Sequence, residues 1–475
     1  MKTIKDLLNT HILSVNADID VPICGISLNT KTIKKGELFF ALKDNTYVRE
    51  AYALGASAVV TEEFLPDIPC VAVKNIRRVL SEACKNFYDD PAKDMCIIGV
   101  VGTNGKTTTT HIISHILRAA GRKNCLIGTL GYSIDGEAFE CAQNTNLTTP
   151  DPHELWRILA AARDNNIKYA VMEISAHAIF FEKLHGLKVD VCAFTNLSRD
   201  HLDFFGDMRR YGNVKKSFFT DENVKLAVIN ADDDSGREIL NSKKVCAVSY
   251  GLKQPADCFA IDIGYGGGKT NLFMNVIDEI VEMSIPLSGE FNVYNALAAV
   301  AVAKSVGISA NSARQYLKSL PPVDGRFNVI SGEKTAIIDY AHTPDGLEKI
   351  LSAARALTKK RVIAVFGCGG NRDRTKRPIM GKIASQNSDL CILTSDNPRF
   401  EEPESIIEEI AAGIDLSVSP VKITDRKTAI EYAFNAADAD DIIVIAGKGG
   451  EPYIDVMGEK IPYSDRETCE NILGV

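Results

Sequence analysis

A glycine-rich segment of this sequence has the residue types that bind nucleotide phosphates. It reads GTNGKTT, from Gly102 to Thr108, and stands between the apolar run CIIGVV and a segment with helical periodicity. Glycines let the loop amides face a phosphate at a helix start, Lys106 can reach the terminal phosphates, and Thr107 can hold magnesium. The strict phosphate-loop pattern would have glycine where this chain has Val100. A tight turn with an incidental lysine is the alternative, but the order of strand, loop and helix favours binding of ATP or GTP.

Three further polar side chains could act beside such a loop. Glu173 lies at the end of the apolar run KYAVMEIS, and His201 follows the run VDVCAFTN. Open α/β sheets assemble their sites at the carboxyl ends of the strands, so Glu173 could meet a magnesium ion on Thr107; the alternative is a solvated glutamate. A lone histidine is more often a structural hydrogen-bonding group than a metal ligand. Lys215 follows Tyr211 by four residues, and the residues alone favour a solvated helix lysine.

Two other loops offer groups that could bind a substrate. In TSDNPR, Asp396 can bind an ammonium group, Arg399 can clamp a carboxylate with two hydrogen bonds, and Pro398 stiffens the loop between them. An ordinary turn is the alternative, and these residues alone favour it. In LTTPDP, Thr148 and Thr149 offer hydroxyl groups before a proline, with a simple turn as an equal alternative.

The elements that must position these residues follow a regular order. Apolar runs of strand length alternate with helix-period segments, which is typical of the α/β class with parallel sheets and crossover helices. A break at residues 89–91 and the linker PPVDG at 321–325 predict three domains. We expect a small N-terminal α/β domain (1–90), a central P-loop-type ATP-binding domain with a mainly parallel sheet (91–325), and a C-terminal Rossmann-like α/β domain (326–475). The expected strands are GELFFAL and CVAV in the first domain, CIIGVV, KYAVMEIS, VDVCAFTN and VKLAVIN in the second, and TAIIDYA, RVIAVFG, LCILTSD and DIIVIAG in the third.

The composition limits the partners of the chain. Its 475 residues carry a net charge of -8, which argues against bulk attraction to nucleic acid or to an anionic membrane. The twelve cysteines stand at least twelve positions apart, so they offer no paired zinc-ligand spacing and are interpreted as reduced thiols. The N-terminus has no signal-peptide core, and no apolar stretch approaches the ~20 residues that span a bilayer. We therefore expect a cytoplasmic monomer that binds neither nucleic acid nor a membrane.

Several motifs together resemble those of the Mur ligase family. GTNGKTTTT, preceded by IIGVV, is similar to the ATP loop of Mur ligases rather than to that of GTPases or helicases. The resemblance covers nearly the whole chain, and the other matches in family order are SLNTKTIKKGELFFAL, LTTPDP, MEISAHA, FTNLSRDHLDFFGDM, GEFNVYNALAA, DGRFNVI, DYAHTPD, FGCGGNRDRTKRP, TSDNPR and AGKGGE. Within the family the chain most resembles the MurE type. This resemblance implies an ATP-dependent amide ligase that phosphorylates a carboxylate of UDP-N-acetylmuramoyl-dipeptide and joins it to a diamino acid, the third residue of the peptidoglycan stem peptide.

The resemblance implies a catalytic centre with magnesium and a modified lysine. The implied catalytic residues are Lys106, Glu173, His201 and Lys215, and the implied metal ligands are Thr107, Glu173, His201 and Lys215. Lys215 would carry a carbamate, because carbon dioxide turns a cation into an anion beside the metals. Lys216 is adjacent, so the choice of Lys215 rests on the family spacing of GDM, a tyrosine and then a lysine after RDHLD. The implied ATP-binding residues are Gly102, Thr103, Asn104, Gly105, Lys106, Thr107, Thr108, Asn295, Arg326, Asp339 and His342.

The resemblance also implies two substrate pockets. The residues implied for the UDP-linked substrate are Thr30, Thr148, Thr149, Ser175 and Lys183, and those for the amino acid are Arg372, Asp396, Asn397, Pro398, Arg399, Gly447 and Glu451. The DNPR form resembles the family signature for meso-diaminopimelate rather than lysine, since the extra carboxylate needs the arginine. The first pocket departs from the family pattern at several positions. Ala176 stands where the family has a second serine, Lys183 where it has arginine, and NTK at 29–31 where it has Asp-Ser-Arg, and the glycine- and histidine-bearing stretch usual after KD near Lys43 is missing.

Other functions remain open at this point. The enzymatic alternatives are a lysine-adding MurE-type ligase and a ligase like folylpolyglutamate synthetase. The motifs GKTTT, TTP and DNPR disfavour the second of these. The non-enzymatic alternative is a nucleotide-gated binding or scaffold protein that has lost the chemistry. Four retained residues argue against it: Lys106, Glu173, His201 and Lys215. From the residues alone, Asn295 could equally be a helix-surface amide, and Arg326 a linker salt-bridge partner.

Overall fold

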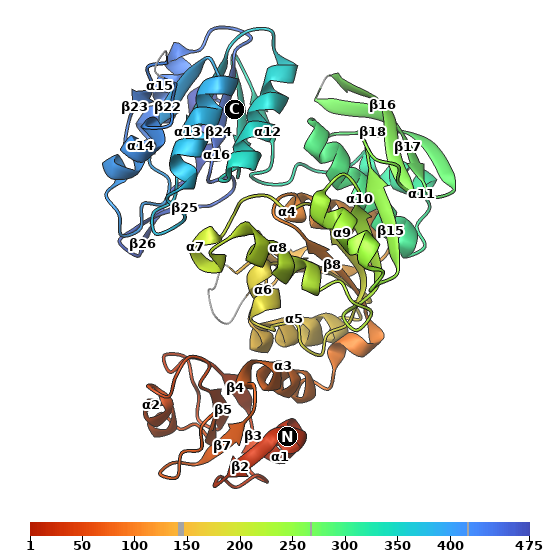
Figure 1. The fold of residues 1–475 in the computed structure, drawn as a ribbon, viewed down its shortest axis with the longest axis vertical. Coiled ribbons are helices and arrows are strands. Elements are labelled where there is room, and N and C mark those ends of the chain that lie inside the picture. The colour runs from red at the N-terminus through yellow and green to blue at the C-terminus, as the bar shows by residue number, and fades with distance from the viewer. Residues whose placement is uncertain (141–146, 267, 416–417) are drawn as a thin grey trace.

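The computed structural model describes residues 1–140, 147–266, 268–415 and 418–475, which form three α/β domains (Figure 1). The N-terminal domain lies at the bottom of that view, the central domain in the middle and to the right, and the C-terminal domain at the upper left. Each domain is built around its own sheet, so the predicted α/β class with three domains is confirmed. Each of the predicted strands is also present.

The N-terminal domain contains a five-stranded sheet with the order β2-β7-β6-β5-β4. Strands β6 and β7 are buried along their whole length, which explains their continuous apolar sequences. The elements of this domain are β1 (Lys2–Thr3), α1 (Ile4–Leu8), η1 (Asn9–His11), β2 (Ile12–Val15), β3 (Pro22–Ile23), β4 (Gly25–Ser27), β5 (Glu37–Phe40), α2 (Val48–Ala53), β6 (Ala58–Thr61), β7 (Cys70–Val73) and α3 (Ile76–Phe87).

Helix α3 fastens the N-terminal domain to the central domain. The indole N–H of Trp156, which is fully buried, donates to the Ser81 hydroxyl at 3.3 Å, and Ser81 donates to the carbonyl oxygen of His185 at 2.7 Å. The Glu182 carboxylate forms an ion pair with Arg78 at 2.7 Å. These contacts fix α3 against the loop that follows α6 (Ala176–Phe180) of the central domain.

The central domain holds an eleven-stranded sheet with the order β11-β10-β9-β12-β8-β13-β14-β15-β16-β17-β18. Strand β8 pairs in parallel with β12 on one side and with β13 on the other, so the phosphate loop leaves the middle of the sheet. The strands are β8 (Cys96–Val101), β9 (Asn124–Gly128), β10 (Gly131–Ile134), β11 (Glu137–Ala138), β12 (Tyr169–Ile174), β13 (Val189–Phe194), β14 (Val224–Asn230), β15 (Ala247–Gly251), β16 (Cys258–Gly266), β17 (Lys269–Val276) and β18 (Glu279–Ile285).

Two buried helices cover the sheet near the loop. Helix α4 (Lys106–Ala119) buries its apolar face against the sheet. Helix α10 (Glu290–Ser305) packs on α4, and every residue from Asn295 to Ala303 is buried, so this part of the helix is enclosed by protein on all sides. Besides α6, the remaining described helices of the central domain are η2 (Pro91–Asp94), α5 (Pro152–Asp164), α7 (Leu202–Phe205), α8 (Met208–Ser217), α9 (Asp234–Ser242) and α11 (Ala310–Leu317).

The C-terminal domain has a six-stranded sheet with the order β19-β20-β24-β21-β22-β23, in which only β19 is antiparallel to its neighbour within the described chain. A hairpin, β25 with β26, extends from it. The elements are β19 (Asn328–Ser331), β20 (Thr335–Asp339), α12 (Pro344–Leu357), β21 (Val362–Phe366), α13 (Lys376–Asn387), β22 (Leu390–Leu393), α14 (Pro403–Ala411), β23 (Val421–Lys422), α15 (Arg426–Ala436), β24 (Ile442–Ala446), β25 (Tyr453–Val456), β26 (Glu459–Pro462) and α16 (Asp465–Leu473).

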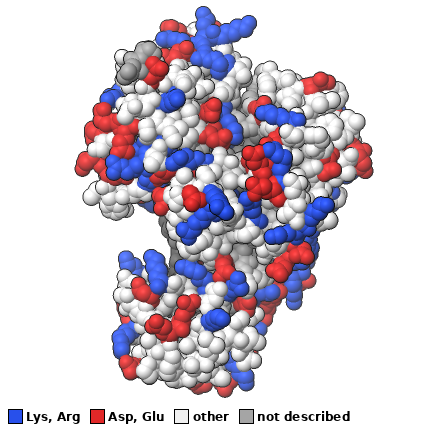
Figure 2. All heavy atoms as spheres, in the orientation of Figure 1, with Lys and Arg blue, Asp and Glu red and all other residues white. Residues whose placement is uncertain are grey.

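The surface carries both signs of charge. Figure 2 shows basic and acidic side chains interspersed over the visible face of all three domains. In the part of the chain that the structure describes, helices fall short of the length and apolar content needed to cross a bilayer.

Candidate active site

The phosphate loop leaves the carboxyl end of β8 and enters α4 directly. Gly105 has a φ of +85°, and a Cβ at this position would lie 2.3 Å from Oδ1 of Asn295, so the position requires glycine. The Lys106 ammonium donates to two carbonyl oxygens of its own loop at 2.9 and 3.0 Å. Burial lowers the pKa of Lys106, and nearby carboxylates oppose this shift.

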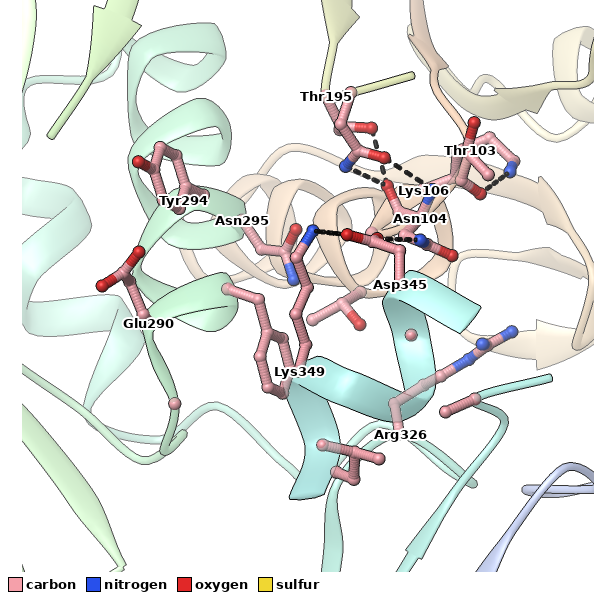
Figure 3. Close-up of a pocket in the computed structure, with 18 of the residues that line it drawn as sticks. Thr103, Asn104, Lys106, Thr195, Glu290, Tyr294, Asn295, Arg326, Asp345 and Lys349 are labelled. Carbon is pink, nitrogen blue, oxygen red and sulfur yellow. Dashed lines mark hydrogen bonds and ion pairs between the residues drawn. The ribbon is translucent and has the colours of Figure 1, made fainter. Parts of the chain in front are cut away.

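A cavity of about 900 Å³ lies between the central and C-terminal domains, over this loop. Figure 3 shows Asn104 and Lys106 of the central domain on one wall, with Arg326, Asp345 and Lys349 of the C-terminal domain opposite them. The predicted site residues that line the cavity are Thr103, Asn104, Gly105, Lys106, Thr107, Thr108, Thr148, Glu173, His201, Asn295, Arg326, Asp339 and His342. The residues implied for ATP and metal binding therefore meet in one cleft, apart from Gly102 and Lys215, which do not line it.

Glu173 and Thr107 both line the cleft and both belong to the central domain. Glu173 is only 1% exposed, so the alternative of a solvated glutamate is wrong. Its carboxylate accepts hydrogen bonds from the backbone N–H and the hydroxyl of Thr129, at 2.8 and 3.1 Å. The Thr107 hydroxyl accepts a hydrogen bond from Arg326 at 3.2 Å.

Asn295 of α10 also lines the cleft. It is buried, so the alternative of a helix-surface amide is wrong.

Lys215 lies behind the phosphate loop, on α8. It is 1% exposed, so the alternative of a solvated helix lysine is wrong. Its ammonium donates to the Thr103 hydroxyl at 3.0 Å and stands 4.3 Å from the centre of the Tyr211 ring. Burial first, and the charge of Lys106 second, hold the pKa of Lys215 well below its ordinary value.

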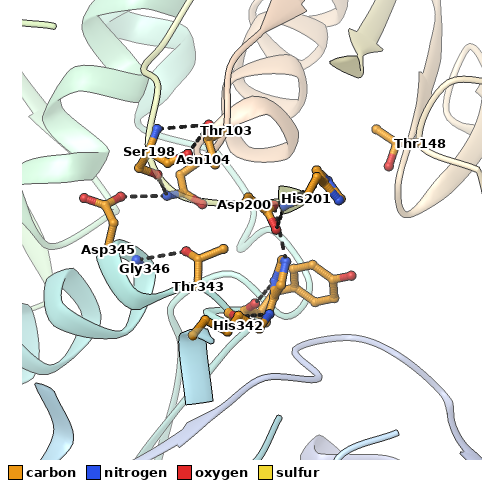
Figure 4. A network of polar contacts seen from close by, with 12 residues as sticks. Thr103, Asn104, Thr148, Ser198, Asp200, His201, His342, Thr343, Asp345 and Gly346 are labelled. Atoms are coloured by element: carbon orange, nitrogen blue, oxygen red, sulfur yellow. Dashed lines mark hydrogen bonds and ion pairs between the residues drawn. The ribbon is translucent and has the colours of Figure 1, made fainter. Parts of the chain in front are cut away.

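A carboxylate connects two histidines from different domains. Oδ2 of Asp200 lies 3.4 Å from Nε2 of His201 and 3.8 Å from Nε2 of His342 (Figure 4). Burial lowers the pKa of His201 to about 3, so its imidazole is neutral near pH 7. Burial alone would raise the pKa of Asp200, but the interaction with His342 holds it below its ordinary value. A neutral imidazole is the form that can accept a proton or bind a metal.

The C-terminal domain also holds the phosphate loop directly. The Asn104 amide donates to the Asp345 carboxylate at 2.7 Å and to the Ser198 hydroxyl at 3.1 Å (Figures 3 and 4). Lys349, one turn further along α12, forms an ion pair with Asp345 at 2.9 Å. The two walls of the cleft are thus hydrogen-bonded to each other.

The residues implied for the UDP-linked substrate fall into two places. Thr149 and Ser175 are joined by a hydrogen bond from the Ser175 N–H to the Thr149 hydroxyl at 3.0 Å. Lys183 is buried beside them and forms an ion pair with Asp151 at 2.9 Å. Thr30 is buried in the N-terminal domain, in the loop after β4, and does not line the cleft.

The residues implied for the amino acid gather on the loops that follow β21, β22 and β24. They are Arg372, Asp396, Asn397, Pro398, Arg399, Gly447 and Glu451. The Asn397 amide donates to the Glu451 carboxylate at 2.8 Å, and the fully buried Lys448 donates to both, at 3.0 and 3.1 Å. The Gly447 N–H donates at 3.0 Å to the carbonyl oxygen of Asp339, a residue of the cleft. The amino-acid loops therefore adjoin the nucleotide cleft.

Sequence reasoning missed three polar residues of these networks. Asp200 directly precedes His201 in SRDH, and Lys448 lies within GKGGE, so their motifs could have indicated them. Asp345 ends the motif DYAHTPD, which could have indicated the residue but not its partner Asn104, 241 positions away.

Gly447 offers a test of how tightly the amino-acid loops are fixed. Its φ is +116°, and a Cβ there would lie 2.4 Å from Oδ2 of Asp396. Gly458 has a φ of +85°, but a Cβ there would meet only the Phe400 ring, at an ordinary 3.5 Å. We expect Gly458→Ala to lower the free energy of unfolding by about 1–2 kcal/mol through backbone strain alone. Gly447→Ala should lower it further, because Asp396 must also move; urea unfolding of both variants measures the difference, and equal losses would contradict it.

Comparisons with known proteins follow the same division of the chain. The sequence matches the Mur ligase middle domain over residues 100–303 and the Mur ligase, glutamate ligase domain over residues 325–449. The UDP-N-acetylmuramoyl-L-alanyl-D-glutamate–2,6-diaminopimelate ligase of Aquifex aeolicus is 41% identical over 457 residues, which cover 95% of this chain and 93% of that protein. The Bacillus cereus protein of the same name is 39% identical over 466 residues, 95% of this chain and 94% of that protein.

A solved structure agrees with these sequence relatives. A structure under the same ligase name has a TM-score of 0.70 and 31% identity, and the match covers 99% of this chain and 98% of that one. Three α/β domains and a phosphate-loop cleft between the second and third define the class, an acid–amino-acid ligase. More particularly, this chain belongs to the Mur ligase family.

Proposed function

We propose that this protein joins meso-2,6-diaminopimelate to UDP-N-acetylmuramoyl-L-alanyl-D-glutamate in peptidoglycan synthesis, with conversion of ATP to ADP and phosphate. The names of its relatives state this pair of substrates. The observation that carries the proposal is the bond between Gly447 and Asp339, where the loop with Gly447 and Glu451 adjoins the phosphate-loop cleft. That loop is bonded in turn to the loop with Asp396 and Arg399, through Asn397 and Glu451. ATP and a UDP-linked sugar as substrates also support a cytoplasmic location.

The proposed reaction has two displacements. A carboxylate oxygen of the donor attacks the γ-phosphorus of ATP, and ADP leaves. The amine of the diamino acid then attacks the acyl carbon, and phosphate and a proton are released. Lys106 and the loop amides would neutralise charge on the phosphates, which is the main demand of phosphoryl transfer. Asp396 would hold an ammonium group of the amino acid, and Arg399 a carboxylate.

Magnesium fits the oxygen atoms of this cleft. Glu173 and Thr107 both line the cleft, and Mg²⁺ usually takes one or two carboxylates together with substrate phosphates. Within the described ranges, three His, Cys, Asp or Glu side chains do not meet closely enough to hold a metal by themselves. Bound there, magnesium would draw negative charge from the γ-phosphate.

The buried Lys215 fits a carbamate for a chemical reason. Carbon dioxide adds to a neutral amine, with formation of an N–C bond and release of a proton. Burial lowers the pKa of Lys215, which favours the neutral amine over the ammonium form. We propose that the resulting anion acts from behind the phosphate loop, next to Thr103, on the side of the cleft where His201 and the metal would lie.

The proposal is tested by following products by mass. The protein is incubated with ATP, magnesium, the UDP-linked dipeptide and one amino acid at a time, either meso-diaminopimelate, lysine or glutamate. We expect the UDP-linked tripeptide with diaminopimelate and a rate about a hundredfold lower with lysine. Lysine lacks the second carboxylate, and the loss of one charged pair of hydrogen bonds corresponds to a factor of that order. A product with lysine alone would refute the assignment of the amino acid, and no product with any of the three would refute the ligase itself.

A further inference from the structure

A fully buried ion pair lies behind the amino-acid loops. Arg426 is the first residue of α15 and Asp465 the first residue of α16, and both are at most 1% exposed. The guanidinium donates to both carboxylate oxygens of Asp465, through Nε and Nη2, each at 2.8 Å. Although burial opposes its charge, Asp465 holds the pKa of Arg426 above its ordinary value. The guanidinium of Arg426 therefore carries its charge although it is buried.

The remaining bonds of Arg426 go to two strand ends. Nη1 donates to the carbonyl oxygen of Ser395 at 3.2 Å, and Nη2 donates to that of Ala446 at 3.0 Å. Ser395 follows β22 and directly precedes Asp396, while Ala446 ends β24 and directly precedes Gly447. One guanidinium thus contacts the starting points of two of the three loops that carry the residues implied for the amino acid.

These two strands are not neighbours in the sheet. The order is β24-β21-β22, so β21 separates the two strands at this point. The planar guanidinium has five N–H donors in a fixed fork, which lets it reach two carbonyl groups and a carboxylate at once. A lysine has one nitrogen and cannot span the same acceptors.

Stability does not explain such a pair well. Buried ion pairs are often no more stabilising than apolar residues of similar volume, because the charges lose their hydration. Buried polar groups can instead fix one geometry among several, which is useful where two loops must hold a ligand between them.

We propose that Arg426, with Asp465 as its counterion, is a positioning residue of the amino-acid site. It sets the separation between the loop with Asp396 and Arg399 and the loop with Gly447 and Glu451, and so determines the affinity for the diamino acid. This inference rests on the proposed function of those loops.

The decisive variant removes both charges. Arg426→Met/Asp465→Leu leaves no unpaired buried charge from this pair, so the domain can still fold. The variant removes the hydrogen bonds from Arg426 to the carbonyl oxygens of Ser395 and Ala446, which connect the two loops. We expect the KM for the diamino acid to rise about tenfold or more, as a small misplacement of binding groups does, with the KM for ATP within about twofold of the unmodified protein. Arg426→Lys keeps the charge and should raise the same KM by a smaller factor, about threefold.

The matched control lies at the opposite edge of the same sheet. Arg361 precedes β21 and forms an ion pair with Asp441 at 2.7 Å. Arg361→Met/Asp441→Leu should leave the KM for the diamino acid unchanged, whatever it does to the thermal unfolding midpoint. If the Arg426→Met/Asp465→Leu variant does not fold, the Arg426→Lys variant decides.

Three outcomes would overturn the positioning role. They are a folded Arg426→Met/Asp465→Leu variant with the original KM for the diamino acid, an equal rise in the KM values for the diamino acid and ATP, and an Arg426→Lys variant with the original KM. Failure of the unmodified protein to form a tripeptide with any amino acid is a different result, because it refutes the proposed function rather than the tie between the loops.

Discussion

Lys215→Ala is expected to lower kcat about a thousandfold, while Lys216→Ala leaves it within about twofold. A preorganised charge beside a reacting phosphoryl group is worth about 10²–10³ in rate, and the proposed carbamate on Lys215 would supply such a charge. The two lysines are adjacent but differ in surroundings. Lys215 is buried against Thr103, whereas Lys216 forms an ion pair with Glu238 at the surface.

Two measurements separate the carbamate from a simple lysine. Steady-state kcat is measured for both variants in buffer with and without added bicarbonate, and protein exposed to ¹³C-labelled bicarbonate is examined by NMR. We expect a carbamate signal in the unmodified protein and in Lys216→Ala, but not in Lys215→Ala. A kcat for Lys215→Ala above one tenth of the original, or equal losses in both variants, would contradict the role of Lys215.

The fold was more predictable than the surroundings of single residues. The buried parallel strands are recognisable in the sequence as continuous apolar runs. The packed face of α4 is recognisable from the helical spacing of Ile112, Ile113, Ile116 and Leu117. Helix α10 shows no such face, because all of its sides are enclosed. The local sequence pattern is therefore sufficient to predict an element that buries one side against a sheet.

The burial of Lys215 could not be read from local pattern. Lysine is almost never fully buried, so its position on α8 favours solvent until the loop with Thr103 is placed over it. Similarly, the contacts of Asn104 with Asp345 and of Arg426 with Asp465 join segments from separate elements. Such pairs depend on how the elements dock, and charge or hydrogen-bonding capacity alone does not select one partner among many.

The backbone at Arg399 supports a functional reason for this arginine. Its φ of +51° is left-handed, which costs about 1–3 kcal/mol for a residue other than glycine. The conformation is held by a bond from the Arg399 N–H to the carbonyl oxygen of Asp455 at 2.9 Å, and by one from the Met457 N–H to the Arg399 carbonyl oxygen at 2.8 Å. The hairpin β25–β26 therefore fixes the direction of this side chain.

Arg399→Ala is expected to lower kcat/KM for meso-diaminopimelate about a hundredfold and that for lysine only slightly. The guanidinium donates through Nη1 to the carbonyl oxygen of Gly370 at 2.7 Å, and its fork has further N–H groups for a carboxylate. Loss of a charged, two-bond contact costs up to about 3 kcal/mol, which is a factor of about a hundred. Since lysine lacks the second carboxylate, the variant should discriminate less between the two amino acids.

Competition assays with both amino acids measure this ratio directly. Arg355→Ala, at the exposed Arg355 of α12, is the matched control and should leave the ratio unchanged. Arg399→Lys should recover part of the loss, because it keeps the charge without the two-bond geometry. Equal losses for both amino acids in Arg399→Ala would mean that the arginine holds its own loop in place and does not bind the carboxylate. Selectivity between the two diamino acids would then have to come from Asp396 and Glu451.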